Sequence, residues 1–283
     1  MGPTRLARNG PVARAYDVRG RGSPLVLIQG MGVGRWGWEP VAARLARRFQ
    51  VITIDNRGIG ASDTPPGHYS TRMMADDVLA VLDHGGIQQA NLIGTSLGGM
   101  IAQELALAHP ERVDKLVLVA TIPGGPRSHP MPLGTTYLLA SAPFMTSKAK
   151  LQQFVHTTLG PTTLRRRPKL ARRLVARKLA HPQPESAWRA QTAAGMLFNP
   201  LGWQRRITQP TLIIQGTADK VVAPGNADVL AGLVPDARVQ RFDGAGHLLY
   251  WEQPKRFVRV VTNFLTDPAS AARVPATPAR RAR

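Results

Sequence analysis

Two hydrophobic patterns alternate along most of the chain. Short, continuous apolar runs, typical of strands buried on both faces of a sheet, lie at 24–29, 50–55, 115–120 and 210–215. Between them are longer segments, such as 71–84 and 254–265, in which apolar residues recur every three or four positions, as they do in helices that cover a core. The alternation predicts an α/β protein built on a doubly wound, mostly parallel sheet.

Weaker patterns predict the remaining elements of this core. Further strands are expected at 12–16, 91–93 and 238–242, and further helices at 38–48, 99–109 and 226–233. Residues 1–10 are polar and are predicted to be irregular. No internal repeat is evident, and the length suits either one elaborated domain or a domain with an insert.

The pattern changes between residues 122 and 206. This segment has no buried-strand run, and its helical patterns lie at about 134–141, 148–159, 169–179 and 185–198. We therefore predict a helical cap at 122–206, inserted into a core made of 11–121 and 207–266. Residues 267–283 are rich in Ala, Pro and Arg and are predicted to be a disordered tail.

Composition narrows the possible chemistry and location. The chain has no cysteine, which excludes disulfides, thiolate metal ligands and a cysteine nucleophile. Its first residues form no apolar leader, and no run reaches the roughly 18 apolar residues of a membrane span. We expect a cytoplasmic protein.

The net charge is strongly positive, at +20. Segment 122–206 alone holds 14 Lys and Arg residues against one acid, Glu185. Because Arg, Ala, Gly and Pro are all abundant, the interpretation we favour is a compositional bias rather than an acidic partner. The amphipathic stretch 165–179 is accordingly predicted to be a solvated helix face, with Leu170, Leu174, Val175 and Leu179 as its apolar stripe. Attachment to nucleic acid or to a membrane surface is the alternative, and we expect neither partner.

The candidate nucleophile lies in residues 94–98, Gly-Thr-Ser-Leu-Gly, between a predicted strand and a predicted helix. A strand that reverses into a helix within one residue forces the central residue into a strained backbone conformation, and glycines relieve the crowding on either side. Ser96 would then project its hydroxyl at a helix N-terminus, where a developing anion is stabilised.

A serine hydroxyl needs a base, and the base needs a carboxylate to orient it. His247 follows the strand at 238–242 in a glycine-flanked turn, and Asp219 follows the strand at 210–215. Because parallel sheets place ligand and catalytic groups beyond the carboxyl ends of their strands, we predict a Ser96–His247–Asp219 triad. Asp243 is nearer to His247 in sequence, but it is predicted to brace the turn instead.

The glycine-rich loop after the first long strand completes the predicted site. Backbone N–H groups of Met31 and Leu97 are expected to form an oxyanion hole. Such a site requires no metal and no cofactor, and none is expected. The candidate substrate-binding residues come from this loop and from the cap, and they are Gln29, Trp36, Trp38, Phe144, Phe198 and Trp203.

Two other polar groups have structural interpretations. Arg57, in the turn after the strand at 50–55, is predicted to clamp neighbouring loops rather than to bind substrate. Asp76 and Asp77 lie on a predicted helix, and we expect them to make surface or capping contacts.

Five motifs together resemble the α/β-hydrolase superfamily, in its esterase, enol-lactonase, polyketide-methylesterase and carbon–carbon hydrolase branch. They are Gln29-Gly-Met-Gly, Asp55-Asn-Arg-Gly-Ile-Gly-Ala-Ser62, Gly94-Thr-Ser-Leu-Gly-Gly99, Gly216-Thr-Ala-Asp219 and Gly246-His-Leu-Leu-Tyr-Trp-Glu252-Gln-Pro254. The resemblance implies the α/β-hydrolase fold, with an eight-stranded, mostly parallel sheet, helices on both faces and an inserted helical cap. Gln29 departs from it, because the family usually has His there. Ser96 argues against haloalkane dehalogenases and epoxide hydrolases, which use Asp as the nucleophile.

The sequence therefore predicts a serine hydrolase with an acyl-enzyme intermediate. Its substrate would be an ester, thioester or lactone of a small to medium apolar molecule. Hydrolysis of a carbon–carbon bond by the same triad is the enzymatic alternative. A ligand-binding receptor or regulator with little turnover, and an anion-binding accessory protein that works through its basic cap, are the alternatives outside enzymology.

Overall fold

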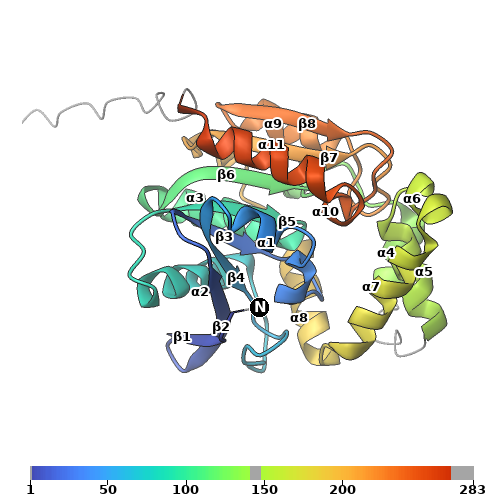
Figure 1. Ribbon diagram of the computed structural model, residues 1–283, viewed down its shortest axis with the longest axis horizontal. Coiled ribbons are helices and arrows are strands. Elements are labelled where there is room, and N and C mark those ends of the chain that lie inside the picture. The colour runs from blue at the N-terminus through green and yellow to red at the C-terminus, as the bar shows by residue number, and fades with distance from the viewer. Residues whose placement is uncertain (1, 141–147, 269–283) are drawn as a thin grey trace, which may run out of the picture.

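Eight strands form one sheet in the computed structural model, which describes residues 2–140 and 148–268 (Figure 1). Their order across the sheet is β1-β2-β4-β3-β5-β6-β7-β8. The strands are β1 (Arg5–Asn9), β2 (Val12–Arg19), β3 (Ser23–Ile28), β4 (Phe49–Ile54), β5 (Ala90–Thr95), β6 (Val113–Val119), β7 (Thr211–Gly216) and β8 (Ala237–Phe242). Every neighbouring pair from β4 to β8 is parallel, so the mostly parallel sheet is confirmed.

The first strand corrects the sequence prediction. Residues 1–10 were expected to be irregular, yet β1 pairs antiparallel with β2, with Arg5 opposite Tyr16 and Asn9 opposite Val12. Gly10, in the two-residue turn between them, has φ +59°, a conformation that glycine adopts without strain. The sequence pattern of β1 did not predict a strand, because its residues are mostly polar and Ala7 is the one residue of β1 that is completely buried. An edge strand of this kind is stabilised by hydrogen bonds to its neighbour.

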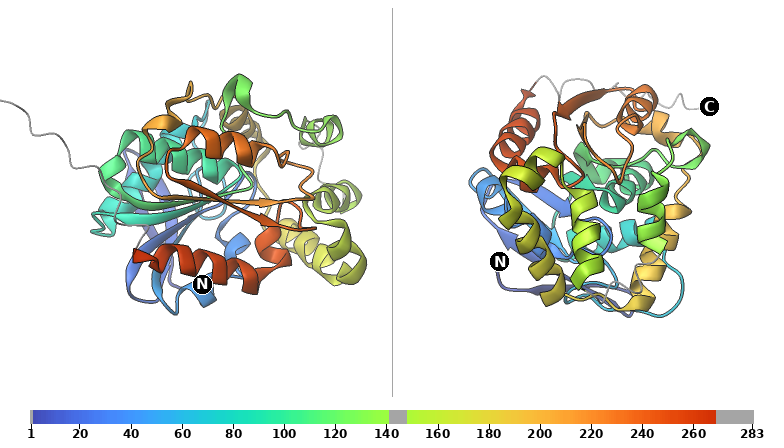
Figure 2. Two further views of the ribbon diagram at one scale, coloured as in Figure 1. Left: turned by 90° about the horizontal axis from the view of Figure 1, so that it is seen from above. Right: turned by 90° about the vertical axis from the view of Figure 1, so that its right-hand side faces the viewer.

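Helices cover both faces of the sheet. One face carries α2 (Thr71–His84), α3 (Leu97–Ala108) and α9 (Asn226–Leu233), and the other carries α1 (Ala42–Leu45) and α11 (Pro254–Thr266) (Figure 2). Alternate residues of β3 divide between the two cores: Val26 and Ile28 join the first, and Leu25 and Leu27 join the second. A strand with both faces buried is therefore apolar throughout, which explains the continuous runs in the sequence.

The helix expected at 38–48 is much shorter. The structure has a 3₁₀ turn, η1 (Arg35–Trp38), and then α1, which ends at Leu45. Pro40 lies between them, and a proline inside a helix removes a backbone donor and clashes with the preceding turn. The other core helices lie close to their predicted positions.

The segment between β6 and β7 is helical, and it lies at one end of the sheet in Figure 1. Its longer elements are α4 (Leu133–Ala140), α5 (Lys148–Thr158), α6 (Pro161–Arg166), α7 (Pro168–Ala180), α8 (Glu185–Met196) and η5 (Trp203–Arg206). The sequence did not predict α6, η5, or the short helix α10 (Leu249–Glu252) after β8. Most of the tail predicted to be disordered lies outside the described residues.

Candidate active site

Ser96 occupies the turn between β5 and α3 with φ 53° and ψ −121°, a conformation that is strained for a non-glycine residue. A Cβ atom on Gly94 would overlap the carbonyl oxygen of Gly98, and one on Gly98 would overlap that of Ile28. The two flanking glycines are therefore required because backbone approaches backbone directly. The predicted strand–turn–helix context of the motif is present.

The neighbouring strand fixes the backbone of Ser96. Its N–H donates to the carbonyl of Val119 at 2.9 Å, and its carbonyl accepts from Thr121 Oγ1 at 2.7 Å. The same carbonyl accepts from the N–H of Gly99, which begins the hydrogen-bond ladder of α3. The strained turn is held on both sides, which keeps the hydroxyl at the N-terminus of the helix.

His247 and Asp219 are in direct contact. His247 Nδ1 lies 2.9 Å from Asp219 Oδ2, and both residues are buried. Asp219 Oδ1 accepts from the N–H groups of Val221 and Val222, at 2.7 and 2.9 Å, while Gln215 Nε2 donates to Oδ2 at 3.1 Å. A carboxylate held by three other donors has a fixed orientation, so it holds the imidazole with Nδ1 toward the carboxylate and leaves Nε2 for another partner.

Asp243 occupies a different position. It lies at the exposed end of β8, and its backbone carbonyl accepts from Gln253 Nε2 at 3.3 Å. Asp243 and His247 are close in sequence, but the imidazole of His247 contacts the carboxylate of Asp219 rather than that of Asp243.

The loop that carries His247 is fixed to the cap by a buried acid that the sequence analysis did not single out. Glu252 Oε1 accepts from the N–H of Gly246 at 2.7 Å, and its Oε2 accepts from that of Gly160 at 3.0 Å. Leu248 N–H also donates to the carbonyl of Thr158. The only sequence signal for Glu252 was its membership of the motif that begins at Gly246.

The glycine-rich loop is held from two directions. Asn56 Nδ2 donates to the carbonyl of Gln29 at 2.9 Å. From α8, Gln191 Oε1 accepts from the N–H of Gly32 at 3.1 Å, and its Nε2 donates to the carbonyl of Arg57 at 2.7 Å. Gln191 thus ties the cap to two core loops, a role that only its position in space reveals.

Gln29 is part of a buried hydrogen-bonded pair. Its Oε1 accepts from Tyr250 Oη at 3.2 Å. Burial raises the pKa of Tyr250 above its usual range, so the phenol stays protonated and can donate this bond. Trp38 packs on the ring of Tyr250, with centroids 4.8 Å apart.

A cavity of about 620 Å³ joins these elements, and Ser96, His247, Met31 and Leu97 all line it. Its wall is mainly apolar and comes from both the core loops and the cap. Of the candidate substrate-binding residues, Gln29, Trp36 and Phe198 also line the cavity.

The other candidates for substrate binding lie elsewhere. Trp38 is fully buried in the core beside Tyr250. Trp203 is 56% exposed, and the guanidinium of Arg206 lies over its ring, 5.6 Å from the centroid. Neither lines the cavity. Aromatic character alone does not distinguish a pocket wall from a packed core or a surface. Phe144 lies outside the described residues.

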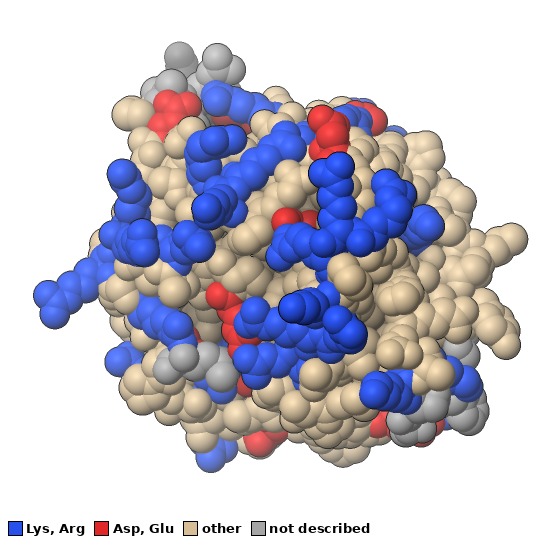
Figure 3. Space-filling model, turned by 45° about the vertical axis from the view of Figure 1, so that its right-hand side comes forward, with Lys and Arg blue, Asp and Glu red and all other residues tan. Residues whose placement is uncertain are grey.

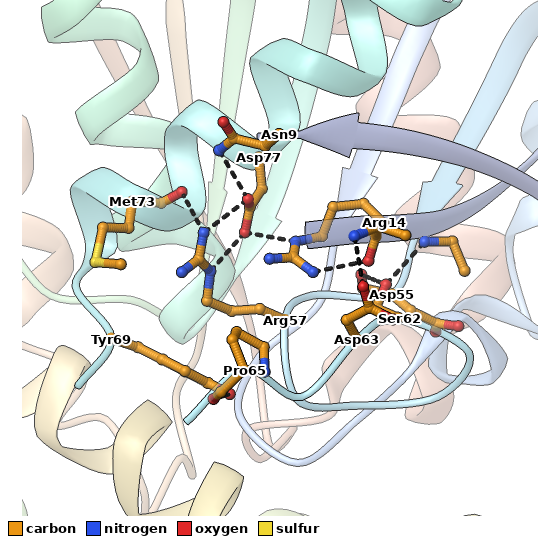
Figure 4. A network of polar contacts seen from close by, with 12 residues as sticks. Asn9, Arg14, Asp55, Arg57, Ser62, Asp63, Pro65, Tyr69, Met73 and Asp77 are labelled. Carbon is orange, nitrogen blue, oxygen red and sulfur yellow. Dashed lines mark hydrogen bonds and ion pairs between the residues drawn. The ribbon is translucent and has the colours of Figure 1, made fainter. Parts of the chain in front are cut away.

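Arg57 has the structural role that was predicted for it, and Figure 4 shows its contacts. Its Nε and Nη2 each donate to the carboxylate of Asp77 at 2.7 Å. Asp77 also pairs with Arg14 at 2.8 Å and accepts from Asn9 Nδ2.

The expectation of a surface or capping role was wrong for Asp77, which is buried between two guanidinium groups that the sequence alone could not bring together. Asp76 is exposed beside Arg72.

Most cations of the basic cap are exposed to solvent. Lys and Arg far outnumber Asp and Glu on the face drawn in Figure 3, and Arg165, Arg166, Lys169 and Arg172 are all exposed. Leu170, Leu174 and Val175 form a buried stripe on α7, whereas Leu179 is 47% exposed near the end of that helix. Within residues 2–140 and 148–268, no group of three or more His, Cys, Asp or Glu could hold a metal ion, and no helix is long and apolar enough to cross a membrane.

Known proteins resemble this chain over most of its length. A family model described as the α/β hydrolase fold matches residues 23–254. The chain is 31% identical over 261 residues to the putative carbamate hydrolase RutD of Azorhizobium caulinodans, covering 91% of this chain and 97% of that protein. It is 30% identical over 269 residues to 2-hydroxymuconate semialdehyde hydrolase of Pseudomonas putida, covering 88% and 89%. The solved structure of Est816, an N-acyl homoserine lactone degrading enzyme, matches with a TM-score of 0.81 and 29% identity, covering 92% of this chain and 100% of Est816.

Proposed function

Because the chain belongs to the α/β-hydrolase fold family, we propose that it is a serine hydrolase that cleaves an ester, thioester or lactone bond of a small to medium, mainly apolar molecule. The observation that carries this proposal is the 2.9 Å contact between His247 and Asp219, beside a cavity that Ser96 also lines.

In the first half-reaction, Ser96 Oγ attacks the substrate carbonyl carbon while His247 Nε2 takes the hydroxyl proton. The tetrahedral intermediate collapses, and the same proton passes from His247 to the departing alcohol or thiol. Water then attacks the acyl-enzyme with His247 as its base, which releases the acid and restores Ser96. Asp219 stabilises the imidazolium in both halves and stays ionised.

The negative charge on the carbonyl oxygen needs donors that are already in place. The backbone N–H groups of Leu97 and Met31 supply them, since Leu97 begins α3 and Met31 belongs to the loop that Asn56 and Gln191 hold. Fixed donors stabilise this charge without reorganising during the reaction, which is why the contacts of that loop matter to catalysis.

A second candidate reaction is the hydrolysis of a carbon–carbon bond. It is favoured by the 30% identity to 2-hydroxymuconate semialdehyde hydrolase. The same three residues would serve it, so the substrate rather than the triad decides between the reactions.

Labelling with a fluorophosphonate tests the proposal. We expect covalent modification at Ser96, none in Ser96→Ala, and turnover of p-nitrophenyl esters with a preference among acyl chains of graded length. Turnover of a vinylogous 1,5-diketone but of no ester would favour the carbon–carbon reaction. Absence of both labelling and turnover would favour a ligand-binding receptor or regulator.

A further inference from the structure

One cation of the cap faces the reaction cavity and is only partly exposed to solvent. Lys178, on α7, is part of the cavity lining. Its ammonium donates to the carbonyl of Gly32 at 3.2 Å, and it lies 5.2 Å from the ring centroid of Phe154 and 5.9 Å from that of Trp188. These contacts orient the ammonium, but none of them neutralises its charge.

The charge of Lys178 is unbalanced within the cavity. Among the described residues that line it, there is no Asp or Glu, and no Lys or Arg other than Lys178. Three other cations of the cap have acidic partners, since Arg173 and Arg177 pair with Glu39 and Arg189 pairs with Glu185. Cations such as Arg165 and Lys169 are exposed and hydrated by solvent. Desolvating a charge among apolar groups costs free energy unless an opposite charge pairs with it. An anion bound in the cavity would therefore be stabilised by Lys178.

We propose that Lys178 binds a carboxylate on the substrate, so that the hydrolase acts on anionic esters or lactones in which a carboxylate lies a short distance from the scissile carbonyl. This inference rests on the proposed function, because it assigns the substrate class of the same site.

The position of Lys178 supports a short separation between the two groups. Gly32 accepts its hydrogen bond and directly follows Met31, whose N–H is the proposed oxyanion donor. A substrate that places its carbonyl oxygen at Met31 therefore has its nearby substituents within reach of the ammonium. The remaining wall is mainly apolar and suits the hydrocarbon part of the molecule.

A carboxylate fits this site better than a phosphate. One ammonium neutralises one negative charge, whereas a phosphate monoester carries nearly two charges and is commonly held by several donors or by an arginine fork. No arginine lines the described part of the cavity.

The test compares matched esters that differ only in charge. Monomethyl adipate and methyl hexanoate have the same chain and the same scissile bond, and a pH-stat measures the acid released from each. We expect the wild-type enzyme to have a higher kcat/KM for the anionic ester. Lys178→Met should lower the ratio of the two kcat/KM values by about 10- to 100-fold, as expected for loss of a hydrogen bond to a charged group. The matched control is Lys169→Met, an exposed position on the same helix, which should leave the ratio unchanged.

The outcomes separate this inference from the proposed function. The inference is overturned if Lys178→Met leaves the ratio of the two kcat/KM values unchanged. If both values fall equally, Lys178 only fastens the cap. If neither ester is hydrolysed and a fluorophosphonate does not label Ser96, the proposed function fails. Calorimetric titration with monomethyl adipate then still tests the anion site: binding lost in Lys178→Met and retained in Lys169→Met supports it, and equal binding in both overturns it.

Discussion

His247 Nδ1 lies 2.9 Å from Asp219 Oδ2, although the two residues are 28 positions apart and follow different strands. The contact forms because β7 and β8 are parallel neighbours, so the loops after both strands emerge at the same edge of the sheet. Asp219 has its remaining acceptor capacity occupied by Gln215, Val221 and Val222, which leaves it one orientation toward the imidazole.

Replacement of Asp219 by Asn should lower kcat by about 10³- to 10⁴-fold, because the amide favours the wrong imidazole tautomer. Asp243→Asn, at the exposed end of β8, should lower kcat by about tenfold or less, since surface substitutions of this kind have small effects. Steady-state kinetics on both variants, with melting temperature as the control for folding, checks the assignment. A larger loss in Asp243→Asn at equal stability would contradict it.

Ser96→Ala should reduce turnover by about 10⁴-fold or more, because the acyl intermediate needs Oγ. Substrate binding should persist, since the cavity wall is otherwise unchanged. Single-turnover kinetics and calorimetry measure the two properties separately. Retention of a tenth of wild-type turnover would mean that another group is the nucleophile.

Gly98→Ala should destabilise the protein by about 3 kcal/mol, because the new methyl group would overlap the carbonyl of Ile28 on β3. Gly232→Ala is the matched control: it lies in α9, and a methyl group there meets nothing within 4 Å. That variant should be about 1 kcal/mol more stable than the wild type, owing to helix propensity. Urea denaturation gives both values, and equal stability of the two variants would refute the steric argument.

Asp77→Asn should cost about 3–5 kcal/mol of unfolding free energy, because it leaves the guanidinium groups of Arg14 and Arg57 buried without their shared carboxylate. Its neighbour provides the control. Asp76→Asn removes only an exposed ion pair with Arg72, and it should change stability by less than about 0.5 kcal/mol. Chemical denaturation of both variants makes the comparison, and similar losses would argue against a structural role for the buried network.

The preference for an anionic ester should be lost as the pH rises through about 8. Burial lowers the pKa of Lys178 to about 8, so its ammonium is present below that pH and is deprotonated above it. The groups in contact with it, the Gly32 carbonyl and the rings of Phe154 and Trp188, carry no charge. The titratable residues that share the described part of the cavity are His129, His247 and Tyr250.

The pH profile of kcat/KM provides the measurement, because it reports groups of the free enzyme. Monomethyl adipate should show an alkaline limb near pH 8 that methyl hexanoate lacks. In Lys178→Met the two profiles should have the same shape. An alkaline limb shared by both esters in the wild type would assign it to another group.

The buried strands and the nucleophile turn were predictable because their causes are local. A strand buried on both faces must be apolar throughout. In Gly94-Thr-Ser-Leu-Gly98, backbone atoms approach so closely that only glycine fits at the first and last positions. The contact between His247 and Asp219 was also predictable, because the residues that follow neighbouring parallel strands lie at the same edge of the sheet. The edge strand β1 was missed, since its hydrogen bonds depend on a neighbour rather than on its own side chains.

What only the tertiary structure decided is the set of partners of each polar or aromatic side chain. Trp36 and Trp38 are two residues apart, yet one lines the cavity and the other packs in the core. Asp76 and Asp77 are adjacent, yet one is exposed and the other is buried between two arginines. Sequence periodicity shows which residues share a face of one element, but contacts across elements depend on how those faces meet. For that reason the chain's motifs predicted the contact between His247 and Asp219, while the contacts of Lys178, Gln191 and Glu252 became identifiable only once the cap and the core were placed together.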